Sequence, residues 1–174
     1  MTAAMSIGRP TTQTQTGTGR FDAPNPASTP MVQLVDETGS RVVDPDFSPQ
    51  LKPAQAVDLL RDMARIRRFD TEATALQRKG QLGLWAPLLG QEAIQVGVRA
   101  ALGPADHVFP SHREHGLALL MGLPVERILA IFKGAEMGDW DAEQLRFHHY
   151  NMVIGAHTLH GVGYAMGQAR DAAA

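Results

Sequence analysis

Apolar side chains recur every three or four residues in several stretches of the chain, a spacing typical of helices that bury one face. The longest stretch begins at Pro53, which suits a first helical turn, and ends at Gly80. Its apolar stripe is expected to be buried and consists of Val57, Leu60, Met63, Ile66, Phe69, Ala73 and Leu76. Basic residues lie mostly off this stripe, on a side that we expect to face solvent or a partner, at positions 61, 65, 67, 68, 78 and 79.

Shorter patterns follow the long helix. The segment GQEAIQVGVRAAL predicts a second helix that stops at Gly103, and the apolar run HVF at 107–109 is compatible with one buried strand. Two more helices are expected at 113–121 and 124–133. The second of them should bury Val125, Ile128, Leu129 and Phe132. Residues 134–151 have no clean period and are expected to form a loop.

The two ends of the chain have other patterns. Residues 1–30 are rich in Thr, Gln, Gly and Pro and poor in large apolar side chains, so we expect a disordered tail. Residues 31–43 alternate and then break at Asp36 to Gly39, which predicts a short hairpin. A last helix is expected at 154–170, although an isolated helix loses roughly 1 kcal/mol at each glycine. Its glycines at 155, 161, 163 and 167 therefore suggest a close backbone approach to a helix, a subunit or a ligand.

Composition narrows the classes of function. The 16 basic and 18 acidic residues nearly balance, so no overall positive field would attract nucleic acid or an anionic membrane. The absence of cysteine excludes disulfides and thiolate chemistry and agrees with a reducing compartment. No apolar run approaches the roughly 18 residues of a membrane-spanning helix, and no secretory signal is evident. We therefore expect an intracellular protein without a nucleic-acid or membrane partner.

The segment PSHREHG at 110–116 contains two histidines, an arginine and a glutamate within seven residues. Ser111 and Glu114 have the spacing of a capping box, in which the serine caps the helix and the glutamate reaches back to it. His112 and Arg113 would then occupy the first helical turn, where the helix dipole disfavours a cation. A phosphate would relieve that penalty through backbone N–H groups and Arg113. An exposed arginine that points into water explains the same residues, so both interpretations stay open.

All seven histidines lie between residues 107 and 160. His112 and His115, or His157 and His160, have a spacing that places two ligands on one helical face. No third ligand recurs at a recognisable spacing and HExxH is absent, so we expect these histidines to cap helices or line polar pockets and predict no metal ligand. The chain also has no G-x-S-x-G elbow, Walker loop or strand-linked G-x-G-x-x-G.

Four segments in one order carry a more specific signal: PMVQLVDETGSRVV, RRFDTEATALQRKGQLGLWAPLLGQEA, DHVFPSHREHGLALLMGLPVERILAIFKG and FHHYNMVIGAHTLHGVGYAMG. Together they resemble the alpha subunit of the thiamin-diphosphate-dependent, decarboxylating component of the 2-oxo acid dehydrogenase complexes, pyruvate or branched-chain type. The resemblance covers about residues 30 to 170. It implies an α/β thiamin-diphosphate-binding fold with a doubly wound parallel sheet. Residues 31–174 would be its truncated N-terminal part, incomplete and mainly helical.

The resemblance also implies an activity: oxidative decarboxylation of a 2-oxo acid, with acyl transfer to the lipoyl group of the acyltransferase component. The family works as an alpha2-beta2 assembly that binds thiamin diphosphate and magnesium between subunits. By matching motifs, His112 and Arg113 would contact the cofactor diphosphate, and Met152 and Ile154, with Gly155 beside them, would lie against its aminopyrimidine ring. No catalytic residue is implied on this chain. A bacterial cytoplasm is expected rather than the mitochondrial matrix.

Three departures from the family pattern limit this interpretation. His112 stands where tyrosine is usual, and His157 where glutamine is common. The magnesium motif, GDG followed later by asparagine, does not follow GYAMG, and MGDW at 137–140 is no substitute. We therefore expect this chain alone to be inactive. The alternative is a truncated, non-catalytic assembly module that docks through its glycine-rich last helix.

Overall fold

The computed structural model describes residues 32–47 and 51–172. The described residues divide into two compact units: residues 32–47, 51 and 52 belong to one, and residues 53–172 belong to the other. The tail predicted for residues 1–30 lies outside the described residues.

The first unit contains the predicted hairpin. Val35 and Arg41 form an antiparallel bridge, and the Asp36 backbone N–H donates to the Ser40 carbonyl at 2.9 Å. Gly39, with φ of 84°, supplies the left-handed turn residue. The hairpin is confirmed for its described residues.

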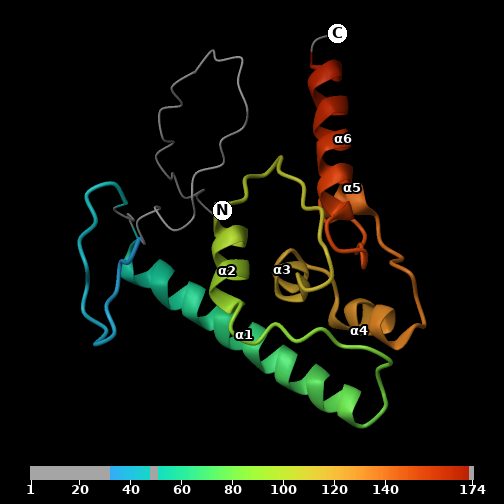
Figure 1. The fold of residues 1–174 in the computed structure, drawn as a ribbon, viewed down its shortest axis with the longest axis horizontal. Coiled ribbons are helices and arrows are strands. Elements are labelled where there is room, and N and C mark those ends of the chain that lie inside the picture. Colours follow the sequence, from blue (N-terminus) through green and yellow to red (C-terminus); the bar gives the residue numbers. More distant parts are fainter. Residues whose placement is uncertain (1–31, 48–50, 173–174) are drawn as a thin grey trace. The chain divides into compact units, whose positions relative to one another are not determined.

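The described part of the second unit is built from helices (Figure 1). They are α1 (Pro53–Arg78), α2 (Glu92–Ala101), α3 (His115–Leu120), α4 (Val125–Lys133), α5 (Ala142–Leu145) and α6 (Ala156–Asp171). The mainly helical character is confirmed. The buried strand expected at 107–109 is reduced to one parallel bridge, between Val108 and Phe147. A short helix, α5, also interrupts the loop expected at 134–151.

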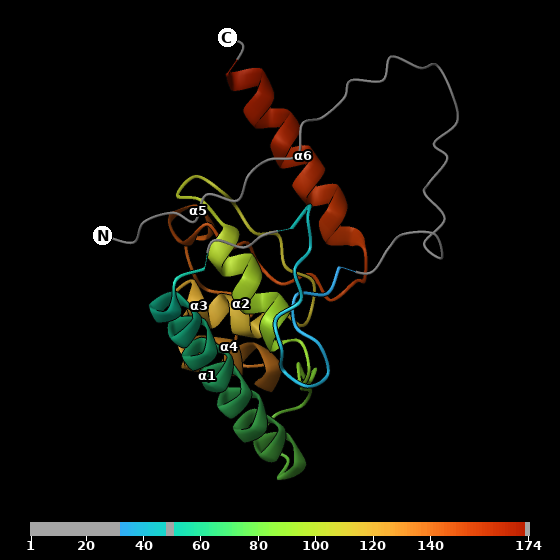
Figure 2. The ribbon, with the colours of Figure 1, turned by 90° about the vertical axis from the view of Figure 1, so that its left-hand side faces the viewer.

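Helix α1 follows its predicted bounds, but only part of its stripe is buried. Ile66 and Ala73 are buried, whereas Val57 and Leu60 are 54% and 62% exposed. The prediction for the first turns of the stripe is therefore wrong. Helices α2 and α3 pack against α1 (Figure 2), where Ile66 joins a core cluster with Val96 of α2. The helix ends as expected near Gly80, which has φ of 70°.

The core of the second unit surrounds α3. Its larger cluster contains Trp85, Leu117, Phe132 and Phe147, all at most 3% exposed. Full burial of side chains of this size contributes about 1.5–3 kcal/mol each. A smaller cluster joins α1 to α2 and to the connection between them, through Ile66, Leu88 and Val96. Helix α3 therefore lies between the two clusters.

Helix α4 confirms its predicted apolar face only in part. Ile128 and Phe132 are buried, while Val125 and Leu129 are half-buried. The helix ends at Gly134, whose φ is 77°, and the Ala135 N–H donates to the Ala130 carbonyl at 2.9 Å.

Helix α6 contains no buried residue and extends away from α1–α4 in both views (Figures 1 and 2). A Cβ on Gly161 would lie 3.6 Å from Phe109, while Gly163 and Gly167 face open space. At Gly163 and Gly167 the predicted close approach of the backbone to a neighbour is therefore absent within the described residues. Across the described ranges, none of the helices combines the length and hydropathy that a bilayer-spanning segment needs.

Candidate functional site

Two stretches of backbone that are distant in the sequence lie side by side in the second unit. Val108 and Phe147 form the parallel bridge. The Val108 N–H donates to the Arg146 carbonyl at 2.9 Å, and the Val108 carbonyl accepts from the His148 N–H at 2.8 Å. We call this pairing the parallel seam; it comprises residues 108–111 and 146–151.

The last backbone contacts of the parallel seam are made by Asn151. The Asn151 backbone N–H lies 3.1 Å from the Ser111 carbonyl oxygen and 3.4 Å from that of Pro110. Because both stretches run in the same direction, the residues that follow leave from the same end. These residues begin with His112 and Met152, so the seam brings together the two segments that the family resemblance singled out.

The turn before α3 differs from the predicted capping box. Helix α3 begins at His115 and its N-cap is Glu114, so the prediction of Ser111 as N-cap is wrong. The Ser111 backbone N–H and hydroxyl instead donate to the Glu114 carboxylate, at 2.9 and 3.1 Å. The predicted pair therefore forms, but it closes a tight turn that contains His112 and Arg113. Since neither residue lies in the helix, the argument from the helix dipole does not apply to them.

Arg113 is fixed at both its backbone and its guanidinium group. The backbone carbonyl accepts a hydrogen bond from Gln95 Nε2 at 2.9 Å, and Gln95 Oε1 accepts from the Leu117 N–H at 2.8 Å. The guanidinium Nη1 donates to the Pro87 carbonyl. A guanidinium carries about five N–H donors. Among the described residues the Pro87 contact engages one of them, so the other donors remain for an anion.

His112 carries an unsatisfied polar atom. Its Nδ1 is buried and has no hydrogen-bond partner among the described residues. Leaving such a group unpaired costs about 1–3 kcal/mol. A ligand acceptor at this position would remove the cost, which makes His112 the second donor of a candidate anion site beside Arg113.

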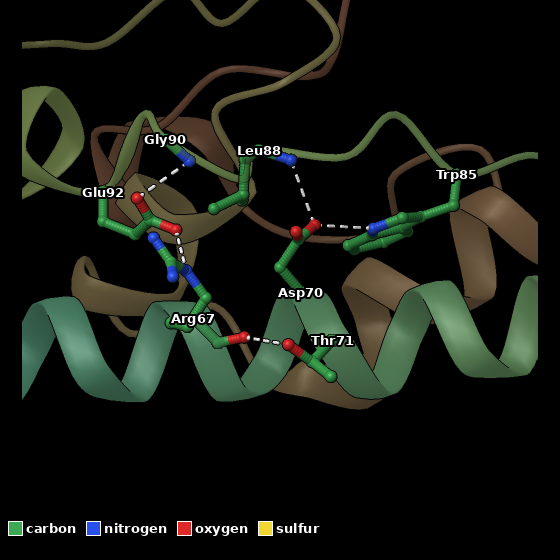
Figure 3. Close-up of polar contacts among 7 residues, drawn as sticks. All are labelled: Arg67, Asp70, Thr71, Trp85, Leu88, Gly90 and Glu92. Carbon is green, nitrogen blue, oxygen red and sulfur yellow. Dashed lines mark hydrogen bonds and ion pairs between the residues drawn. The ribbon is translucent and has the colours of Figure 1, made fainter.

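Two buried carboxylates, those of Asp70 and Glu92, hold the connection between α1 and α2 (Figure 3). Pro87, whose carbonyl accepts from Arg113, belongs to this connection. Asp70 Oδ1 accepts from Trp85 Nε1 at 2.9 Å and from the Leu88 N–H at 3.0 Å. Glu92 accepts from the Gly90 N–H at 3.0 Å and pairs with Arg67. These bonds fix the segment 85–90 and hence the Pro87 carbonyl.

Periodicity predicted neither a helix nor a strand for the segment 85–90. One signal could have identified its anchor. Asp70 follows Ile66 by four positions and precedes Ala73 by three, so it lies on the buried face of α1 and needs a polar partner. The Arg67 contact lowers the pKa of Glu92 below its ordinary value. Arg67 is exposed, as expected of the basic residues of α1, and it also pairs with the buried Glu92.

His115 is fully buried and connects three segments. Its Nε2 lies 3.0 Å from the Ala86 carbonyl oxygen, and its Nδ1 lies 3.4 Å from the Tyr150 hydroxyl. The ring also packs 4.5 Å from Trp85, centroid to centroid. Burial lowers the pKa of His115 to about 4, so the ring is neutral at pH 7 and Nε2–H donates to Ala86. Both ring nitrogens are thereby occupied in a structural role.

Residues 152–155, which follow the second stretch of the seam, are exposed. Met152 and Ile154 are 45% and 79% exposed, and the Ala156 N–H donates to the Val153 carbonyl at 3.1 Å in the turn between them and α6. Gly155 caps α6 with φ of 90°, a conformation that favours glycine. The segment therefore presents apolar side chains at the end of the seam where His112 also emerges.

The histidine pairs weighed in the sequence do not form a metal centre. In the described part of the chain, one group of three possible ligands is close enough to share an ion, and it contains neither pair. His157 instead has a buried Nδ1 without a hydrogen-bond partner in the described residues.

Comparison with known proteins supplies independent information. The sequence model of the family described as dehydrogenase E1 component matches residues 61–174. The 3-methyl-2-oxobutanoate dehydrogenase subunit alpha of Mycobacterium tuberculosis is 34% identical over 148 residues, which is 80% of this chain and 40% of that protein. The pyruvate dehydrogenase E1 component subunit alpha of Staphylococcus aureus is 33% identical over 135 residues, 78% of this chain and 36% of that protein. The chain thus spans at most about 40% of the length of these relatives.

Proposed function

Because this chain belongs to the dehydrogenase E1 component family, we propose that it is the N-terminal part of the alpha subunit of a thiamin-diphosphate-dependent 2-oxo acid dehydrogenase. The whole enzyme would oxidatively decarboxylate pyruvate or a branched-chain 2-oxo acid and pass the acyl group to a lipoyl arm. It would do so as an alpha2-beta2 assembly. Residues 31–174 would contribute helices to a thiamin-diphosphate-binding fold with a parallel sheet, and the enzyme would work in a bacterial cytoplasm.

The parallel seam is the observation that carries this proposal. It brings His112 and Arg113 to the same end as Met152–Gly155, although the two segments are distant in the sequence. A buried, unpaired imidazole nitrogen beside a guanidinium with spare donors fits the oxygens of a diphosphate. These residues therefore fit the group that the family implies.

Each residue then has a defined task. Arg113, held by the Pro87 carbonyl, would donate charge-assisted hydrogen bonds to diphosphate oxygens. His112 would donate through its Nδ1, which has no hydrogen-bond partner among the described residues. The backbone of Met152 and Ile154, with Gly155 beside it, would lie against the aminopyrimidine ring and exclude water from it. Thiamin diphosphate, when bound, supplies the electron sink for decarboxylation. We assign no magnesium ligand and no catalytic residue to this chain.

The test is cofactor binding to the assembled enzyme. In the alpha subunit that contains this sequence, paired with its beta subunit, Arg113→Ala should weaken thiamin diphosphate binding in the presence of magnesium. Losing a hydrogen bond to a charged group costs about 1.5–3 kcal/mol, equivalent to roughly a 10- to 150-fold rise in Kd. Calorimetric titration measures this change. Arg68→Ala, which removes an exposed arginine paired with Glu72, is the matched control and should leave the Kd unchanged. Equal affinity in the Arg113→Ala enzyme would exclude the anion role.

A second function, that of a non-catalytic assembly module, is favoured by α6. This helix has no buried residue and exposes Leu159, Val162 and Met166. The module would capture the beta subunit without binding cofactor. Titration of the 174-residue chain with thiamin diphosphate and magnesium, beside a beta-subunit pull-down, separates the two functions. Heat of cofactor binding by the chain alone would contradict the expectation that its site is incomplete.

A further inference from the structure

Three possible metal ligands from different parts of the chain meet beside the parallel seam. They are His107, Glu143 and His148, and one ligand atom from each lies within 4.8 Å of the others. None of them belongs to the proposed cofactor site. His107 and His148 lie within segments that carry the family resemblance, but the resemblance assigned neither of them a role. His107 and His148 are 41 positions apart, so sequence spacing gave no indication of this group.

The seam explains why these side chains meet. Successive residues of extended backbone point to opposite faces. Phe147 is completely buried and Val108 packs against the same core cluster, so their neighbours point to the opposite side. On that side the rings of Phe109 and His148 stack at a centroid distance of 3.8 Å. The backbone pairing therefore fixes both histidines on the face opposite the core.

The distances suit a transition-metal site. His107 Nδ1 and His148 Nε2 are 3.2 Å apart. Two imidazole nitrogens that share a tetrahedral zinc ion at about 2.0–2.1 Å from each lie roughly 3.3 Å apart. Glu143 contributes a carboxylate oxygen, and one ligand atom from each of the three residues lies within 4.8 Å of the others. The 4.0 Å contact of Glu143 is with the second ring nitrogen of His107, Nε2, and the Glu143 side chain is 66% exposed and able to adjust.

The surroundings provide a supporting group and an entry path. The Tyr164 hydroxyl of α6 donates to Glu143 Oε2 at 3.2 Å and lies 3.2 Å from His107 Nε2, the ring nitrogen that does not face His148. An open groove of about 840 Å³, lined in part by His107, Glu143 and Tyr164, gives access from solvent. Arg146 and Asp106 line the same groove with opposite charges, and Asp106 accepts from the Gly103 N–H at 2.7 Å.

We propose that His107 Nδ1, His148 Nε2 and the Glu143 carboxylate bind a zinc ion, with the fourth position filled by water. Imidazole nitrogens select zinc, cobalt or nickel over magnesium and calcium, which prefer oxygen ligands. The ion links α5 to His148 of the seam and to His107, which directly precedes the seam. Through the hydrogen bond from Tyr164 to Glu143 it also reaches α6, which lacks buried residues of its own. This site departs from the expectation that the chain has no metal ligand. It is independent of the proposed cofactor function.

The experiment is a titration of the 174-residue chain with zinc chloride, followed by calorimetry, and with cobalt chloride, followed by visible absorption. We expect one ion per chain and the absorption bands of tetrahedral cobalt. His148→Gln and Glu143→Gln should each weaken binding by more than the ~10- to 100-fold typical of losing an outer-shell partner. His160→Gln, which removes an exposed histidine of α6, is the matched control and should bind as the unaltered chain does.

Two results would overturn the proposal: the absence of stoichiometric zinc binding, or unchanged affinity in Glu143→Gln. Circular dichroism shows whether each variant is folded. If His148→Gln unfolds because the Phe109 stack is lost, Glu143→Gln decides alone, since the exposed Glu143 side chain supports no core packing. Thiamin diphosphate is absent from these titrations, so their failure leaves the proposed function untouched.

Discussion

His115 shows how one buried residue makes folding sensitive to pH. Desolvation lowers its pKa from 6.5 to about 4, aided by the charges of His112 and Arg113 and opposed by the Ala86 hydrogen bond and Glu114. Between these two pKa values the unfolded chain binds a proton at this position and the folded chain does not. The stability due to neutral His115 is therefore complete above pH 6.5 and is lost as the pH falls toward 4.

We predict that this group alone lowers the free energy of unfolding by about 2 kcal/mol between pH 7 and pH 5. Urea denaturation at the two pH values measures the difference. His115→Gln should show a smaller pH effect than the unaltered chain, whatever its stability at pH 7. His160→Gln, at an exposed site, should keep the full effect. An identical pH effect in His115→Gln would show that His115 is not the group responsible.

At the residue scale, sequence reasoning identified some roles and missed others. Arg113 and His112 were singled out by a family motif, and their role in cofactor binding stays a prediction. Among the described residues Arg113 contacts Pro87, and His112 Nδ1 has no hydrogen-bond partner. His115, two positions later, was weighed only as a metal ligand or a polar-pocket histidine. Its partners Ala86 and Tyr150 are 29 and 35 positions away. Local spacing holds no information about such partners.

At the scale of elements, Gly116 sets how closely α3 can approach its neighbours. A Cβ at this position would lie 2.8 Å from Gln95 Oε1 and 2.8 Å from two carbon atoms of Ile66. Gln95 cannot withdraw freely, because its Oε1 accepts from the Leu117 N–H. The absent side chain thus permits the packing of α3 against α1 and α2.

Gly116→Ala should therefore destabilise the chain, by about 1–3 kcal/mol as in other overpacked cores. Gly97→Ala is the control, since Gly97 lies within α2 and faces open space. It should be neutral or stabilise the chain by up to ~1 kcal/mol. Chemical denaturation of both variants gives the two values. Equal effects on stability would contradict a steric role for Gly116.

Periodicity predicted the long elements well and the short polar ones poorly. The bounds of α1 and the ends at Gly80 and Gly134 follow from apolar spacing and glycine. The start of α3 does not, because Ser111 and Glu114 satisfy each other in a turn rather than across a helix end. The HVF run is apolar enough for a strand, but only one bridge joins it to a neighbour in the described chain.

At the scale of the whole molecule, stability should be uneven. Helix α3 lies between two core clusters, whereas α6 buries none of its residues and contains three glycines within it. An isolated helix of this length is marginal in water. We expect the amides of α6 to exchange with deuterium much faster than those of α3 in the chain without added metal. Hydrogen-exchange mass spectrometry measures both, and equal protection would contradict this picture.

The sequence alone could not predict the seam. The spacing of apolar residues gives information about neighbours along the chain, whereas the seam joins segments that are far apart in the sequence. His107 and His148, at 41 positions, illustrate this limit. The order of helices could be predicted, but the way in which they bring the two segments together could not.

The seam also has a consequence for the order of events in folding. Helices form from local contacts, while a pairing across some 40 residues must first close a long loop and forms more slowly. During synthesis, α1 and α2 have neighbours to pack against before Asn151 has been made, whereas the backbone after Pro110 has none of its seam partners. The segments that we assign to ligand binding are therefore the last to take shape, and any interruption before that moment yields helices without a site.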